Sequence, residues 1–174
     1  AFIAAFFNIF ISANLFGGAS LTVEKYCVIN SLSVGFVEET TKLLGALLCV
    51  CLFKSNRKID YILAFGSVGA GFEIMETFAY SDNIVSSLPR IILALHVVWL
   101  LYDGANYFEY KNGRSLALLK AYCFTILLHA FYDCGLMMLQ HSDVRETVLL
   151  TGFIVTIIGI TANIIFVFNI YLSN

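Results

Sequence analysis

Residues 30–53 read NSLSVGFVEETTKLLGALLCVCLF, an apolar run with three charged side chains in its middle. A helix needs about 20 apolar residues to cross a bilayer core of about 30 Å, and this run is long enough. A charged side chain within a span costs about 3 kcal/mol or more unless it faces a protein interior or a wet cavity. The run therefore predicts a membrane-spanning helix whose functional face carries Glu38, Glu39 and Lys42.

The whole chain shares this apolar character. Its 174 residues are 60% hydrophobic and 13% charged, and the formal net charge is −2. Soluble domains are about 45–50% apolar and about 25% charged, so we expect an integral membrane protein. The small net charge gives no electrostatic reason to expect a nucleic-acid partner. The lipid bilayer is the expected environment, and partners are expected within the membrane.

Six apolar stretches are candidates for membrane spans. Because a backbone in hydrocarbon must satisfy its own hydrogen bonds, we predict that they are helices. The fold class is therefore all-α, a polytopic transmembrane bundle of about six spans in a single domain over residues 1–174. We interpret the first stretch as a span and not as a signal peptide, because no basic segment precedes it. The stretches are residues 1–16, 30–53, 61–80, 88–108, 116–140 and 148–172.

The basic residues of the connections predict the orientation of the chain. Cytoplasmic loops of membrane proteins carry an excess of Lys and Arg. The second and fourth connections are the more basic, so we expect them to be cytoplasmic and residues 17–29, 81–87 and 141–147 to be extracytoplasmic. The basic residues of the second and fourth connections are Lys54, Arg57, Lys58, Lys111 and Arg114, followed by Lys120, against Lys25, Arg90 and Arg145 elsewhere.

Ionisable side chains occur in four successive predicted spans, which indicates a four-helix functional core. With a rise of 1.5 Å per residue, most of them lie roughly 6–16 Å below the extracytoplasmic surface, so they can share one layer. Asp103 is expected to lie nearer the cytoplasmic headgroups, outside this site. The set consists of Glu38, Glu39, Lys42, Glu73, Glu76, His96, Asp103, His129 and Asp133.

Helical spacing predicts pairs within this set. Lys42 follows Glu38 by four residues and Glu39 by three, so its ammonium can pair with either carboxylate. His129 and Asp133 are four residues apart, the spacing at which a carboxylate can orient an imidazole. A buried structural ion pair and a simple interhelical hydrogen bond are the alternative interpretations.

Taken in order, these residues resemble the PrsW family of intramembrane proteases, which is grouped with the CAAX prenyl endopeptidases and bacteriocin-processing relatives. Residues 38–42 are similar to the EExxK motif, residues 71–76 to a GFxxxE segment, His96 to the next histidine, and residues 129–133 to the closing HxxxD. The likeness covers about residues 30–140. The chain departs from the family pattern at Glu73, where an uncharged residue is common.

The resemblance implies an endopeptidase that cleaves a membrane protein near the extracytoplasmic membrane edge, in a bacterial plasma membrane. An anti-sigma factor is the substrate expected for the family. Peptide hydrolysis needs a base for the attacking water and a donor for the oxyanion. Either glutamate of the EExxK motif is the candidate base, the histidines stabilise the oxyanion, and Asp133 orients its histidine. The predicted catalytic residues are Glu38, Glu39, Glu76, His96, His129 and Asp133, with Lys42 and Glu73 in supporting positions.

Two mechanisms remain open at this point. Glu76, His96 and His129 have the ligand types of a catalytic zinc site. A metal-free route, in which an ionised glutamate activates water, is favoured because Lys42 would add positive charge beside the cation. A proton- or cation-coupled transporter that uses the buried Glu and His layer is the alternative function, with Asp103 as its only continuation. A catalytically inactive scaffold is a third interpretation.

Overall fold

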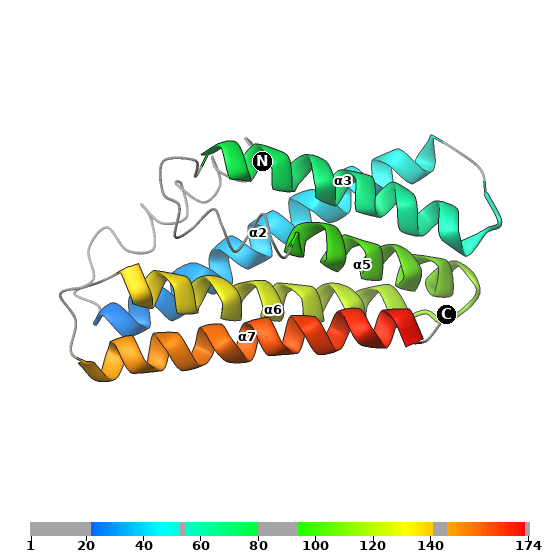
Figure 1. The fold of residues 1–174 in the computed structure, drawn as a ribbon. Helices are drawn as coiled ribbons and strands as arrows, with labels where there is room; N and C mark the ends of the chain where they lie inside the picture. The colour runs from blue at the N-terminus through cyan, green and yellow to red at the C-terminus, as the bar shows by residue number, and fades with distance from the viewer. Residues whose placement is uncertain (1–21, 53–54, 80–93, 141–145, 173–174) are drawn as a thin grey trace. The chain divides into compact units, whose positions relative to one another are not determined.

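The computed structural model describes residues 22–52, 55–79, 94–140 and 146–172 (Figure 1). All the regular secondary structure in these ranges is helical, which confirms the predicted all-α class. The first predicted span, residues 1–16, lies outside the described residues. The helices are α2 (Val23–Cys51), α3 (Lys58–Ala79), α5 (Leu95–Lys111), α6 (Ala117–Gln140) and α7 (Glu146–Leu172).

The start of α2 differs from the predicted span, because the helix begins at Val23 and not at residue 30. The backbone N–H of Tyr26 already donates to Thr22 O at 2.9 Å, and Glu24 lies in the first turn. A carboxylate there is favoured by the partial positive charge of a helix N-terminus. The predicted span was bounded by hydropathy, so it left out the polar residues before position 30. These residues nevertheless continue the helix beyond its apolar part.

The other described boundaries lie close to the predictions. α5 ends at Lys111, three residues beyond the predicted 108, and Gly113 then adopts a positive φ of 96°. Asn112 N–H donates to Phe108 O and Glu109 O, which closes the helix before the chain turns. The predicted start of this span at residue 88 lies outside the described residues.

Two described helices are long and apolar enough to cross a membrane. These are α3 and residues Ala117–Leu139 of α6, while α7 contains a shorter apolar segment, Leu150–Ala162. Large apolar side chains are exposed along α7, which suits an environment of lipid. They are Leu150, Phe153, Ile154, Ile157, Ile158, Ile164 and Ile165.

The chain divides into two compact units, and the division falls inside α2 and inside α6. The first unit runs over residues 39–125, and the second over residues 2–38 and 126–174.

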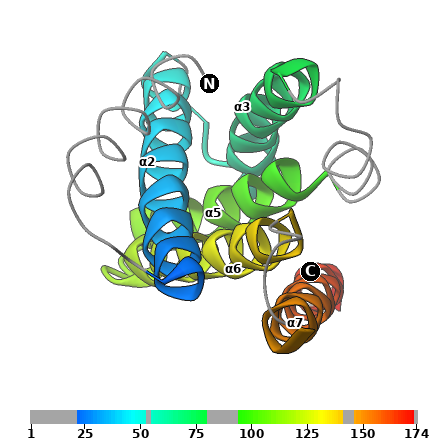
Figure 2. The same cartoon turned by 90° about the vertical axis from the view of Figure 1, so that its left-hand side faces the viewer.

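The first unit is built on close packing of α3 against α5, which lie side by side in Figures 1 and 2. At Gly69 a Cβ atom would lie 2.5 Å from His96 O and 2.9 Å from Val97 Cα, so only glycine permits this approach. The close approach of the two helices therefore depends on Gly69, whereas Gly71 faces open space. The apolar core beside this contact consists of Ala46, Val50, Tyr61, Phe65 and Leu100.

Tyr61 joins the start of α3 to the end of α5 within the first unit. Its hydroxyl donates to Ser55 O at 2.5 Å and accepts from Lys111 Nζ at 2.7 Å. This hydrogen bond raises the pKa of Lys111, since it favours the charged ammonium. The two helices are thus held in register at the end opposite to His96.

The second unit contains the first part of α2, the last part of α6 and α7, of which α6 and α7 run side by side (Figures 1 and 2). A Cβ atom at Gly35 would lie 3.1 Å from Ile126 O and 3.3 Å from Ala130 N, so α2 approaches α6 closely. Cys27 and Cys134 are buried here as free thiols.

Candidate active site

The predicted site residues are buried side chains, although they are acidic or basic. Buried charges are retained in proteins when they are paired or functional, because their desolvation is costly. Glu38, His129 and Asp133 belong to the second unit, and the others belong to the first. Those of the first unit are Glu39, Lys42, Glu73, Glu76 and His96.

Lys42 is the centre of the contacts in the first unit. Its ammonium pairs with Glu39 Oε1 at 2.5 Å, with both side chains fully buried, so the pairing left open by the sequence is made with Glu39. The same Nζ lies 2.6 Å from His96 Nδ1. It also lies 4.6 Å from the centre of the Phe72 ring and 5.5 Å from that of Trp99, which are cation–π distances.

His96 is oriented through both of its ring nitrogens. An ammonium has no lone pair, so Nδ1 accepts from Lys42, and the neutral imidazole then carries its proton on Nε2. Nε2 faces a carboxylate oxygen of Glu76, and the two are hydrogen-bonded. The ring lies edge-on to Phe72 and Trp99, with centroids 5.2 and 5.3 Å away. His96 thereby presents an N–H donor held by four neighbours.

Glu73 has a structural role in this arrangement. α5 follows Ala94, which has a φ of 42° and no side chain that can cap the helix. Glu73 Oε2 from α3 accepts from the backbone N–H of His96 at 3.2 Å and so satisfies one of the unpaired donors of the first turn. The glutamate that departs from the family pattern therefore caps the helix that carries His96.

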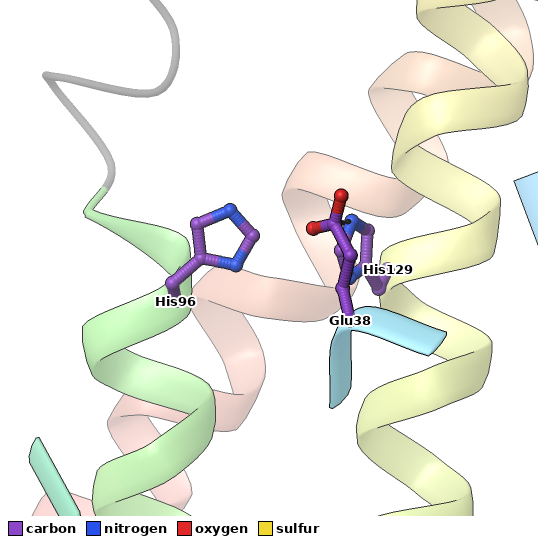
Figure 3. Close-up of side chains that lie close together, drawn as sticks. All are labelled: Glu38, His96 and His129. Carbon is purple, nitrogen blue, oxygen red and sulfur yellow. Dashed lines mark ion pairs between the residues drawn. The ribbon is translucent and has the colours of Figure 1, made fainter. Parts of the chain in front are cut away.

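The second unit brings Glu38, His129 and Asp133 together (Figure 3 draws the first two). His129 Nε2 lies 3.2 Å from Asp133 Oδ2 and 3.7 Å from Glu38 Oε2. The predicted pairing of His129 with Asp133 is confirmed. Glu38 can reach His129 because Gly35, one turn earlier, lets α2 pack against α6.

Some of the side chains of the site suit the role of metal ligands, and one does not. Glu38, His96 and His129 are each buried, and each offers one ligand atom, as zinc requires. A ring nitrogen binds zinc through its lone pair, and with Lys42 on Nδ1 the Nε2 atom of His96 carries a proton. His96 in this arrangement therefore does not fit the role of a zinc ligand, whereas Glu38 and His129 do.

Two features of the site were not predicted from the sequence. The first is the Trp99 ring, whose centre lies 5.5 Å from Lys42 Nζ, and its position three residues after His96 was the available signal. Thr40 Oγ1 and Tyr122 Oη form a hydrogen bond of 2.5 Å between α2 and α6, which no spacing in the sequence indicates.

Apolar helices with buried contacts between carboxylates and imidazoles are consistent with a membrane-embedded enzyme. The chain belongs to the PrsW family of intramembrane metalloproteases, because the family model matches residues 1–164. It is therefore an intramembrane protease, and the transporter alternative is not favoured. The family description also makes zinc a candidate cofactor. Comparisons with curated proteins and with solved structures found no significant match.

Proposed function

We propose that this protease hydrolyses a peptide bond of a membrane-protein substrate by means of a water molecule that Glu38 activates. One observation supports Glu38 over Glu39 as the base. Lys42 pairs with Glu39, whereas Glu38 faces the imidazole of His129. A carboxylate already held by an ammonium at 2.5 Å is a weaker base than one beside a neutral imidazole.

The Glu38 and His129 pair is the proposed place for the attacking water. The two atoms lie 3.7 Å apart, beyond a direct hydrogen bond, and in the proposal one water contacts both of them. In the proposed reaction Glu38 takes a proton from this water as its oxygen bonds to the carbonyl carbon. The proton then passes to the leaving amine as the C–N bond breaks. Asp133 keeps the His129 ring in position throughout.

His96 is the proposed donor to the oxyanion. Lys42 on the opposite nitrogen fixes the proton on Nε2, where it donates to Glu76, and in the proposed reaction the oxyanion replaces Glu76 as the acceptor of this N–H. Glu76, which accepts this N–H, is the proposed second acid–base group. Glu38 belongs to the set around His129 and Glu39 to the set around Lys42. Because these two glutamates are consecutive residues of α2, we assign both sets to one reaction.

A zinc ion, if bound, would lower the pKa of a bound water and polarise the peptide carbonyl. Glu38 and His129 are the residues that would hold it. No step is assigned to it here, because the proton position on His96 does not suit a third ligand. The metal-free route is therefore the proposed one.

The proposed setting is a single protease domain in a six-span helical bundle of a bacterial plasma membrane. The Lys and Arg distribution supports an extracytoplasmic position for the site, so cleavage is expected near that edge of the bilayer. An anti-sigma factor is the proposed kind of substrate, on the basis of the family resemblance.

A trap experiment tests this function. The Glu38→Gln variant should capture a full-length membrane protein, and the unmodified protease should convert that same protein into two fragments in detergent. Reconstituted vesicles provide the control for the transporter alternative. Proton or cation flux that Glu38→Gln abolishes, without any cleavage by the unmodified chain, would contradict the proposal.

A further inference from the structure

A hydrogen bond between two side-chain hydroxyls joins α2 to α6 within the first unit. Thr40 Oγ1 and Tyr122 Oη lie 2.5 Å apart, and the pair is partly buried. Inside a bilayer core no water competes for such hydroxyls. The proposed mechanism does not use this bond, although Thr40 directly follows Glu39 and lies two residues before Lys42.

Thr40 and Lys42 point to opposite sides of α2. Successive residues of an α-helix are turned by about 100°, so side chains two residues apart are separated by about 200°. On one side Thr40 contacts Tyr122 of α6, and on the other Lys42 Nζ lies 2.6 Å from Nδ1 of His96 in α5. A rotation of α2 about its own axis would therefore disturb both contacts together.

α6 is itself in contact with α5, the helix that carries His96. The rings of Tyr102 in α5 and Phe124 in α6 pack edge to face, with their centroids 6.4 Å apart. Residues 112–116 also connect these two helices directly. α2, α5 and α6 thus form a closed set of three contacts in the first unit. In such a set, the hydrogen bond from α6 to α2 limits how α2 can turn relative to α5.

We propose that Tyr122 is a positioning residue, which acts on His96 by way of α2. Its hydrogen bond with Thr40 fixes the rotation of α2 at which the Lys42 ammonium reaches Nδ1 of His96. Glu39 lies on the same helix as Lys42, so their ion pair turns with α2 and does not oppose a rotation. The importance of this positioning for catalysis rests on the function proposed above, in which His96 donates to the oxyanion.

Removal of either hydroxyl tests this role in activity, on the substrate that Glu38→Gln captures. Tyr122→Phe and Thr40→Val should each lower kcat about tenfold with KM unchanged, because the oxyanion donor is displaced while substrate binding is untouched. The double variant should lose no more than either single one, since both remove the same bond. Thr40→Ser keeps the hydroxyl and should keep kcat. Tyr110→Phe, at an exposed tyrosine of α5, is the matched control and should leave kcat unchanged.

Nitrogen NMR of the histidine ring supplies a second readout that needs no cleavage. The chain has three histidines, so ¹⁵N-histidine labelling together with His129→Gln and His141→Gln isolates His96. In this background, Tyr122→Phe should move the Nδ1 signal toward its position in Lys42→Met. Combined with Lys42→Met, Tyr122→Phe should move the signal no further, because the ammonium through which it acts is gone.

The outcomes separate the two proposals. An unchanged Nδ1 signal in folded Tyr122→Phe, additive losses of kcat in the double variant with Thr40→Val, or an unchanged kcat in Tyr122→Phe would overturn the role of Tyr122. The expected signal shift in a protein that cleaves no substrate would leave the positioning of Lys42 intact, and would contradict the proposed function instead.

Discussion

Lys42 decides how the buried charges of the first unit are distributed. Its ammonium is shared between Glu39 and His96 Nδ1, at 2.5 and 2.6 Å. This arrangement neutralises Glu39 and fixes the position of the proton on His96. Glu38, the preceding residue, is thereby left to face His129. Two adjacent glutamates thus have different partners, and we assign them different roles.

The Glu39 and Lys42 pair makes a prediction about stability. Glu39→Gln should lower the free energy of unfolding by about 3 kcal/mol, because it leaves a buried ammonium without its counter-charge. Glu39→Gln combined with Lys42→Met should regain most of this stability, since no unpaired charge remains, but activity should stay low. Thermal and denaturant unfolding in detergent measure the effect. Equal destabilisation by the single and double variants would contradict the pairing.

The sequence could predict only part of these contacts. Pairs within one helix, such as His129 with Asp133, follow from a spacing of four residues. The choice between Glu38 and Glu39 as partner of Lys42 did not follow, because both spacings permit contact. The contact of Lys42 with His96 joins two helices 54 residues apart, and only tertiary packing determines it.

At the scale of the helix, Gly69 positions His96. The contact of Gly69 with the backbone of His96 and Val97 sets the distance between α3 and α5. This distance brings Glu73 to the first turn of α5 and Glu76 to the imidazole. Glycine-rich packing was predictable from the composition of α3, whereas the partner helix and the cap by Glu73 were not.

Two glycine substitutions test this packing. Gly69→Ala places a methyl group 2.5 Å from His96 O, so the helices must separate, and we expect a loss of stability of about 1–3 kcal/mol and at least a tenfold fall in cleavage rate. Gly71→Ala is the matched control, because nothing lies within 4 Å of the added atom. It should be neutral or slightly stabilising in a helix. Similar effects of the two substitutions would argue against the observed helix contact.

The hydroxyl of Tyr61 makes a separate prediction for the other end of the same helices. Tyr61→Phe removes the bonds to Ser55 O and Lys111 Nζ, and it should lower the free energy of unfolding by about 1 kcal/mol. Cleavage should change little, because His96 lies far along the helix. Unfolding in detergent, compared with the cleavage rate of the same preparation, measures both effects.

For the whole molecule, composition predicted a helical membrane protein, and the described helices agree with it. Two of them satisfy the length and composition of a span, while charged side chains interrupt the apolar character of α2. The predicted boundaries fail where helices continue past their apolar part, as at Val23. The division of the chain at Glu38 was not predictable, because it depends on contacts between residues distant in sequence.

The predicted orientation can be tested by cysteine labelling of the whole chain. In a background with all five cysteines replaced, Asn56→Cys and Asn112→Cys should be shielded from an impermeant thiol reagent in intact cells, and Asn83→Cys should react. The reverse pattern would place the site on the cytoplasmic side. Labelling after permeabilisation controls for burial of the introduced thiols.

Metal dependence is a further property of the whole enzyme. Because Lys42 donates to Nδ1 of His96, we expect purified active protein to keep its activity after treatment with a zinc chelator. Elemental analysis of the same preparation gives the metal content. Stoichiometric zinc, with activity lost on its removal and restored on its return, would show that His96 changes partners and would favour the metalloprotease mechanism.

The most direct test of the central claim is the cleavage rate of Glu38→Gln on the substrate that this variant captures. The substitution keeps the size of the side chain and removes its basicity, so we expect cleavage to fall by several orders of magnitude. The variant should still accumulate in the membrane with an unfolding transition close to that of the unmodified protein. Near-normal cleavage by Glu38→Gln would contradict the assignment of Glu38 as the base.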